Sequence, residues 1–434
     1  MSLARLMVIA AGVAVGLAAA IGPGWAQTLR DRLPGGLTTI VREQRDAPVV
    51  AVSLFVRGGS RWDPPEQPGL SNLLHQVMVK GTRARSALEL AEAAEDLGGS
   101  IGAATEPDSA EIRGTALAQH WRALVALLAE IALAPALREA DVESERRAAL
   151  SQIRSRRDQP FPRAFDALTA RLFGEHPYGR SPLGTEESVR RLTRADLAAF
   201  HARTYRANRV VASVVGQINA AEVRAELARA LAALSPGDGQ ADEALAPVAA
   251  VADRVAIAQP AAQAQVLVGA VGPPVAHADY AVVKVLVTAL GGGMSGRLFT
   301  ELRDKQGLAY ATGALYPTRA GQGPVVAFLG TAPANAQRAE DGILAQIARL
   351  RSERLPPEEL ARAKGYLLGQ FAMDRRTSAR IAWYQGFFEL AGVGADFPER
   401  YVRAVNAVTT DDVQRAAARY LSAPVVVSLR PPAP

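Results

Sequence analysis

Residues 69–82, with the sequence GLSNLLHQVMVKGT, place apolar and polar residues with the period of an α-helix. One stripe is apolar and is predicted to be buried: it holds Leu70, Leu73, Leu74, Val77 and Met78. The opposite stripe carries Asn72, His75 and Gln76 at positions i, i+3 and i+4, so these side chains are expected to project the same way. The pattern predicts an amphipathic helix with two amides and one imidazole on its polar side.

Strand and helix periods both recur along the chain, in irregular order. A valine-rich strand is predicted at 49–56, entering a turn at 57–60, and two more strands at 265–271 and 325–330. Helices are predicted around 69–79, 86–98, 118–133, 138–158, 161–173, 277–290, 295–306, 334–351 and 356–372. This order favours an α+β fold, with mainly antiparallel sheets flanked by helices, over a doubly wound parallel sheet.

Two stretches, 192–216 and 408–429, follow the same plan. Each begins with a threonine N-cap and an aspartate three residues later, continues as an alanine-rich helix to a tyrosine, and ends in a valine-rich strand. The matched residues are Thr193, Asp196 and Tyr205 in the first stretch and Thr409, Asp412 and Tyr420 in the second. The repetition predicts two tandem homologous domains of roughly 200 residues each. We expect them at 27–234 and 250–434, joined by a linker at 235–249 that begins Ser235-Pro236-Gly237.

Residues 1–26 have the features of a secretory signal peptide. Arg5 supplies a positive start, Leu6 to Ile21 is apolar, and Gly24-Trp25-Ala26 is a small-x-small cleavage site. An uncleaved membrane anchor is the alternative, but the apolar run is shorter than the roughly 20 residues that a span needs. We therefore expect a periplasmic protein, with no membrane attachment after cleavage.

Composition and charge exclude several kinds of site and partner. The chain of 434 residues has no cysteine, which excludes disulfides, thiolate metal ligands and a lipid-modified cysteine. The formal net charge is +6, but basic and acidic residues are interleaved, as in RSRRDQ and ELRDKQG. Because the basic residues form no aromatic-rich stripe, a nucleic-acid partner is not expected.

Several segments, in order, resemble the insulinase/pitrilysin superfamily, specifically its mitochondrial-processing-peptidase-like group of small bacterial members. They are residues 33–82, His176-Pro177-Tyr178-Gly179, Leu183-Gly184-Thr185, the stretch 192–216, and GGGMSGRLFTELRDKQGLAYATGALY at 291–316. The resemblance covers almost the whole chain after the signal peptide. It implies a clamshell half made of two homologous domains, and a zinc-dependent peptidase fold.

The sequence departs from this family at the zinc site. Asn72 and Gln76 stand where the family has its two histidine ligands, and His75 stands where it has the catalytic glutamate. The family's third ligand aligns with Gln152, within one residue. Protein zinc sites use Cys, His, Asp or Glu, so amides predict a degenerate site and no metal cofactor in this chain. His120, His176, His201 and His277 show no paired metal spacing and are expected to be surface or core residues.

The family's second-domain signature is kept. Gly307 is predicted to end the helix 295–306, with Leu308, Ala309 and Tyr310 starting the next strand. From spacing alone, Arg303 is a solvated helix charge and Tyr310 an edge residue. The resemblance instead implies that Arg303 and Tyr310 reach the zinc half of the molecule and hydrogen-bond substrate backbone or the oxyanion.

Gly291, Gly292 and Gly293 form a loop that feeds this helix. The loop lacks the lysine and the spacing of a phosphate-binding P-loop. A flexible turn that also contacts substrate is the preferred interpretation.

Three functions are open on these observations. The first is a non-catalytic, substrate-binding subunit of a heteromeric zinc metallopeptidase, supplying Arg303 and Tyr310 to a homologous partner with an intact His-x-x-Glu-His motif and bound zinc. The second is a peptide-binding or scaffold homodimer with no role in proteolysis. The third is a working peptidase with an unorthodox metal site at His75, which the weak affinity of one imidazole plus amides for zinc disfavours.

Overall fold

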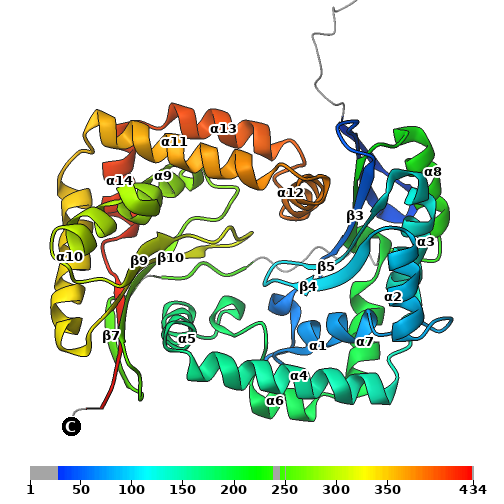
Figure 1. Ribbon diagram of the computed structural model, residues 1–434, viewed down its shortest axis with the longest axis horizontal. Coiled ribbons are helices and arrows are strands. Elements are labelled where there is room, and N and C mark those ends of the chain that lie inside the picture. Colours follow the sequence, from blue (N-terminus) through cyan, green and yellow to red (C-terminus); the bar gives the residue numbers. More distant parts are fainter. Residues whose placement is uncertain (1–27, 238–244, 250, 433–434) are drawn as a thin grey trace, which may run out of the picture.

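The computed structural model describes residues 28–237, 245–249 and 251–432, so the predicted signal peptide lies outside the described residues. The described chain forms two β-sheets flanked by helices, which confirms the predicted α+β class (Figure 1). The first sheet has the strand order β1-β2-β6-β3-β5-β4 and the second has the order β7-β11-β8-β10-β9. The strands are β1 (Thr28–Arg32), β2 (Thr38–Glu43), β3 (Val49–Val56), β4 (Ser100–Thr105), β5 (Ala110–Leu117), β6 (Val210–Gly216), β7 (Asp253–Ala258), β8 (Ala264–Gly272), β9 (Ala311–Leu315), β10 (Gly323–Thr331) and β11 (Val425–Arg430).

The two sheets share one topology. In the first, β2 runs parallel to β6, and β6-β3-β5-β4 continue antiparallel. In the second, β7 runs parallel to β11, and β11-β8-β10-β9 continue antiparallel. β1 is an extra antiparallel strand on the first sheet. The repeat inferred from the two closing stretches therefore extends to the whole strand order. The exact domain limits stay a prediction.

Most of the predicted helices form at the expected places. The α-helices are α1 (Leu70–Met78), α2 (Ala87–Asp96), α3 (Trp121–Leu133), α4 (Glu139–Asp158), α5 (Pro160–Phe173), α6 (Glu186–Arg191), α7 (Arg194–Thr204), α8 (Ala220–Ala230), α9 (Tyr280–Gly291), α10 (Ala336–Ser352), α11 (Pro357–Asp374), α12 (Ser378–Leu390), α13 (Phe397–Ala407) and α14 (Thr410–Tyr420). Both predicted capping boxes are present: Thr193 with Asp196 at α7 and Thr409 with Asp412 at α14. Among the described helices, none is long and apolar enough to cross a bilayer.

One predicted helix differs. The segment 295–306 is not an α-helix: a short turn at Gly293–Ser295 is followed by the π-helix η7 (Leu298–Asp304). Hydrogen bonds such as Lys305 N–H to Thr300 C=O (3.1 Å) span five residues and widen the coil. Leu298 and Leu302 are its buried residues. These two leucines lie four residues apart and share the buried face of the coil.

Each half contributes one helix to the sheet of the other half. α5 packs on β8 and β11 of the second sheet, and α12 packs on β3 and β6 of the first (Figure 1). Two glycines allow the close approach. A Cβ on Gly386 of α12 would lie 2.4 Å from the Phe55 ring, and a Cβ on Gly269 of β8 would lie 2.7 Å from the Leu168 side chain. The sheets are therefore buried on both faces, which explains their nearly continuous valine-rich strands.

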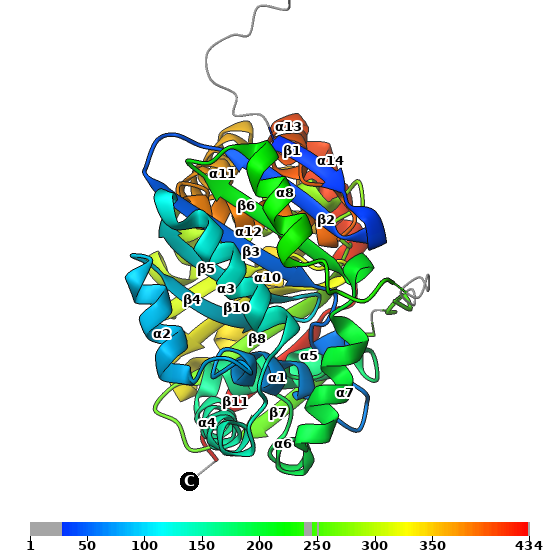
Figure 2. The same ribbon diagram turned by 90° about the vertical axis from the view of Figure 1, so that its right-hand side faces the viewer.

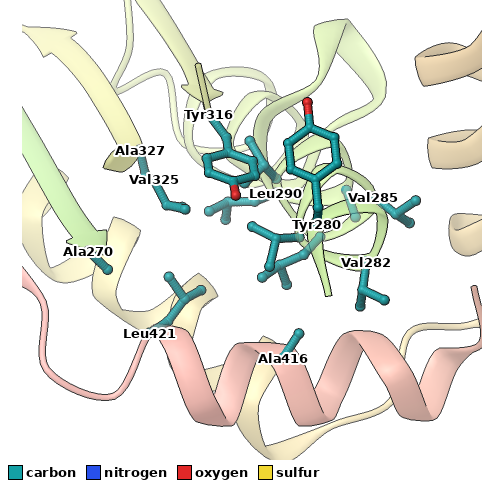
Figure 3. Packing of buried hydrophobic residues seen from close by; sticks show 14 of the residues in the cluster. Ala270, Tyr280, Val282, Val285, Leu290, Tyr316, Val325, Ala327, Ala416 and Leu421 are labelled. Atoms are coloured by element: carbon teal, nitrogen blue, oxygen red, sulfur yellow. The ribbon is translucent and has the colours of Figure 1, made fainter. Parts of the chain in front are cut away.

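The two halves of the chain also share part of their hydrophobic core. One cluster lies between the first sheet and helices α1, α2, α3 and α8, and another between the second sheet and α9, α10 and α14. Figure 3 shows this second cluster around Tyr280, Tyr316 and Leu290. Ile40, Phe55 and Val211 of the first sheet belong to the same cluster as these second-half residues. The apolar core therefore runs continuously from one half into the other.

Candidate functional site

The degenerate zinc helix, α1, is well fixed at its start. Gly69 takes a positive φ of 93° just before it, and the carboxylate of Asp63 accepts hydrogen bonds from the backbone N–H groups of Gly69 and Ser71, both at 2.9 Å. Asp63 is buried, and burial raises its pKa to about 7 although these two hydrogen bonds act in the opposite direction. The carboxylate thus satisfies N–H groups that have no partner inside the helix.

The predicted polar stripe of α1 is divided. Asn72 is only 8% exposed and Gln76 is half-buried, but His75 is fully buried. The Nδ1–H of His75 donates to the carbonyl of Ser71 at 2.7 Å, and the ring packs 5.9 Å from that of Tyr205 on the α7 side. Its Nε2 has no hydrogen-bond partner among the described residues. His75 is therefore part of the core, and of the three side chains on this stripe Gln76 keeps the most exposure.

Gln152 lies on α4, which packs against α1. It is exposed on α4, whereas the buried residues of that helix are Val142, Arg146 and Ala149. Ile153, the next residue, is half-buried and continues their helical spacing. Ile153 is thus the alternative on the inner face of α4, and which of the two residues is equivalent to the third ligand stays a prediction.

These residues do not fit a zinc ion. Asn72 and Gln76 offer only amides, His75 is enclosed, and neither Gln152 nor Ile153 carries a ligand that zinc prefers. In the described part of the chain, no three His, Asp or Glu residues lie together as a metal site would require.

A cavity of about 550 Å³ lies between the first sheet and α12. Its lining includes Ser100 and Gly102 of the edge strand β4, Glu111 and Arg113 of β5, and Arg380 and Trp383 of α12. The Glu111 side chain is only 4% exposed, with one oxygen 3.2 Å from Arg113 and the other without a described partner. Burial raises its pKa. Among the described strands β4 pairs with β5 alone, so its outer backbone groups are open to an added strand next to this cavity.

Arg303 and Tyr310 lie on either side of the turn that ends η7. Arg303 is exposed on the π-helix, with its guanidinium 4.8 Å from the centre of the Phe299 ring. Tyr310 directly precedes the edge strand β9, donates its backbone N–H to Gly330 C=O, and is 63% exposed. Gly307 between them has a φ of +62°, as predicted for a helix-ending residue. Both side chains are accessible, and each is free to contact another molecule.

The Gly291–Gly293 loop is tightly packed. A Cβ on Gly291 would lie 2.3 Å from the backbone N of Ala314 in β9, and one on Gly293 would lie 2.8 Å from the Tyr366 ring. Gly293 also has a φ of +69°. Close approach of the chain to β9 and α11 thus explains two of these glycines, and contact of the loop with substrate stays a prediction.

A buried polar network joins the two halves near the His176-Pro177-Tyr178-Gly179 motif. Asp108 is 1% exposed and accepts hydrogen bonds from the Tyr178 hydroxyl and, at 3.0 Å, from the Ala320 backbone N–H. Arg61 lies 3.3 Å from the same carboxylate. Gly321 N–H donates to Tyr178 Oη at 3.0 Å. This motif therefore attaches the second half's loop to the first half; sequence analysis identified the motif but not its partner Asp108.

Comparisons with known proteins identify the family. Residues 38–186 match the model of insulinase, peptidase family M16, and residues 191–367 match the model described as the peptidase M16 inactive domain. An uncharacterized zinc protease of Mycobacterium tuberculosis is 30% identical over 91% of this chain and 90% of its own length. The chain belongs to peptidase family M16. This confirms the insulinase/pitrilysin resemblance, and α1 lies within the part that matches the insulinase model.

Solved structures agree with this assignment at the level of fold. The M16 chain is similar to a peptidase M16 inactive domain from Pseudomonas fluorescens, with a TM-score of 0.88 at 24% identity, covering 94% of this chain and 98% of the other. It is also similar to a protease from Helicobacter pylori, with a TM-score of 0.87 at 20% identity, covering 94% and 100%. The two-sheet arrangement is therefore that of other M16 chains.

Restoring zinc ligands to α1 tests whether its backbone frame is intact. The purified protein should contain no zinc, whereas a variant with Asn72→His, His75→Glu, Gln76→His and Gln152→Glu should retain some. A companion with Ile153→Glu in place of Gln152→Glu should bind more tightly, approaching about one zinc per chain, because residue 153 shares the inner face of α4. Metal analysis after dialysis gives the content. Equal zinc in the wild-type protein would contradict the assignment of a degenerate site.

His75 should make stability depend on pH. Burial lowers the pKa of His75 from 6.5 to about 4, so the unfolded chain binds a proton between these values while the folded chain does not. Stability contributed by the neutral ring is therefore present above pH 6.5 and lost as the pH falls towards 4, by up to about 3 kcal/mol. Urea midpoints at pH 7, 5.5 and 4.5 measure this loss. In His75→Gln the loss should be smaller, and an unchanged pH dependence would exclude this role.

Proposed function

We propose that this M16 protein is the zinc-free, substrate-binding subunit of a two-subunit periplasmic zinc metallopeptidase that acts on peptides. In this proposal its partner is a homologous chain that has an intact His-x-x-Glu-His helix and holds the zinc. The observation that carries the proposal is the contrast between two sites. On α1, amides and an enclosed imidazole replace the metal ligands and the base, whereas Arg303 and Tyr310 remain accessible on the second half.

The accessible pair has chemistry suited to a partner's active site. A guanidinium donates forked hydrogen bonds to peptide carbonyls, and a phenol hydroxyl donates to an oxyanion that forms at the scissile bond. Arg303 lies on a π-helix, a conformation that is frequent at functional sites. The edge strand β4 and its neighbouring cavity would in addition hold an extended peptide segment by strand addition.

Reconstitution tests the proposal. The protein, a homologue with the intact zinc motif, and their mixture are compared in the cleavage of a quenched fluorescent peptide, with complex formation followed by size-exclusion chromatography. We expect cleavage from the mixture and little from either chain alone. If the zinc-bearing homologue cleaves peptides equally well without this protein, the subunit role is wrong. Peptide binding by a homodimer of this chain, without any effect on cleavage, would favour the scaffold alternative.

A further inference from the structure

A second cavity, of about 1000 Å³, lies where the outer strands of the first sheet meet α12 and α13. Arg30 of β1 forms a forked ion pair with Glu389 of α12 at 2.6 and 2.9 Å, and Figure 2 labels β1 at the upper edge of the first sheet. The cavity is therefore built from both halves of the chain. It is separate from α1 and from the Arg303 and Tyr310 surface.

Two arginines from different halves enter this cavity. Arg42 lies two residues after Ile40 on β2, so the two side chains lie on the same face of the sheet. Ile40 belongs to the core cluster shared with the second half, so this face is directed towards that cluster. Arg375 comes from the end of α11. The Nε–H groups of Arg42 and Arg375 are both buried, and neither has a hydrogen-bond partner among the described residues. Burial lowers the pKa of Arg42, and the Arg375 charge lowers it further.

The acidic groups of the cavity neutralise this pair only in part. Glu389 is paired with Arg30, and Glu399 forms an ion pair with Arg375 by accepting from its Nη2 at 3.2 Å. Asp396 is bonded to Arg400 at 3.0 Å. Arg403 adds a further positive charge at the exposed rim. Two half-buried guanidiniums therefore lie close enough to repel each other, each with its Nε–H unused, and an oxyanion in the cavity would satisfy these donors and reduce the repulsion.

The loop between α12 and α13 forms one wall of the cavity. Gly392 and Gly394 have φ values of 82° and 87°, and their N–H groups bond back to Glu389 and Phe388 of α12. The loop is thus held by its own hydrogen bonds beside the arginines. The volume is that of a pocket for an organic ligand, and greatly exceeds what a lone phosphate ion fills.

We propose that this cavity binds an organic oxyanion, through its phosphate or carboxylate group, between Arg42 of the first half and Arg375 and Arg403 of the second. Bound there, the anion links β2 to the α11–α13 region and stabilises the contact between the two halves. This binding site does not depend on the proposed peptidase role.

Calorimetric titration of the purified protein tests the site. Pyrophosphate and citrate are the probes, each in a buffer free of other polyvalent anions and with ionic strength held constant by sodium chloride. We expect saturable binding of at least one probe and a matching rise in the melting temperature. Binding of pyrophosphate alone would identify a phosphate group as the preferred ligand chemistry, and binding of citrate alone would identify a carboxylate.

Matched variants locate the binding. Arg42→Gln and Arg403→Gln should each weaken it by roughly tenfold or more, because each removes a charged donor. Arg362→Gln, the same change at an exposed position of α11 outside the cavity, should leave it unchanged. If Arg42→Gln does not fold, the exposed Arg403 still provides the comparison. No saturable binding of either probe, or equal binding by all three variants, would overturn the proposal.

Discussion

Replacing Tyr310 with phenylalanine should lower the turnover of the reconstituted two-subunit peptidase by roughly ten- to a thousandfold, as expected for a lost hydrogen bond in the transition state. The change removes one hydroxyl and keeps the ring. Because the side chain is 63% exposed and its backbone N–H is already bonded to Gly330, folding and subunit association should be unaffected. Steady-state cleavage of a model peptide, with thermal melts of each chain, measures both quantities.

Two further variants sharpen this result. Tyr420→Phe removes the same atom from a tyrosine whose hydroxyl bonds to Asp279, outside the proposed site, and should leave turnover near the wild-type value. Arg303→Ala should weaken substrate affinity as well as turnover, since a guanidinium also binds peptide carbonyls in the ground state. Combined with Tyr310→Phe, its effect should be less than additive if both residues hold one substrate segment. Wild-type turnover in Tyr310→Phe and Arg303→Ala would show that the pair is structural.

Replacing Asp108 with alanine should destabilise the protein by about 3–5 kcal/mol. The carboxylate is buried and is shared by Arg61, the Tyr178 hydroxyl and the Ala320 N–H, so its loss leaves a nearly buried guanidinium and two donors unpaired. Burial and the Asp108 charge raise the pKa of Tyr178, which keeps its hydroxyl protonated and able to donate. Unfolding in urea, followed by fluorescence, gives the change in stability.

The control for this prediction is a surface aspartate. Asp158 is exposed and lies 3.8 Å from Arg157, so Asp158→Ala should change stability by no more than about 0.5 kcal/mol. The loss of stability in Asp108→Asn should lie between the losses in the two alanine variants. The amide oxygen still accepts one hydrogen bond, but the charge opposite Arg61 is lost. An unfolding midpoint for Asp108→Ala equal to that of Asp158→Ala would mean that the network does not hold the halves together.

The sequence predicted those elements whose determinants are local. The threonine and aspartate capping boxes of α7 and α14 and the apolar stripe of α1 are set by residues three or four apart, and all appear in the structure. α12 was not predicted, because it is enclosed between the first sheet and neighbouring helices and its buried residues include Ser378, Gln385 and Gly386 as well as Phe387. A helix covered on several sides has no clean polar stripe to detect.

In the candidate site too, the sequence predicted the features that depend on local residues and missed those that depend on packing between distant segments. The chemical identities of Asn72, His75 and Gln76 were sufficient to predict the loss of metal ligands, but spacing alone placed His75 with the amides. Its burial depends on Tyr205, which is distant in sequence. The π-helical form of 298–304 was not predicted, because its apolar pattern, with Leu298 and Leu302 four residues apart, fits an α-helix equally well. The pairing of Arg42 with Arg375 joins residues from opposite halves and has no local signal.

The exchange of α5 and α12 between the sheets has a consequence for how this chain came to be and how it folds. A gene fragment encoding either half alone would yield a sheet with one bare apolar face, since the helix that covers β3 and β6, or β8 and β11, would be missing. An ancestral single unit would therefore have needed a second copy to complete it, with each copy covering the other. Joining the two halves in one chain makes that mutual dependence permanent. We accordingly expect the two halves to unfold in one cooperative transition, although the amino-acid sequence repeats the same unit twice.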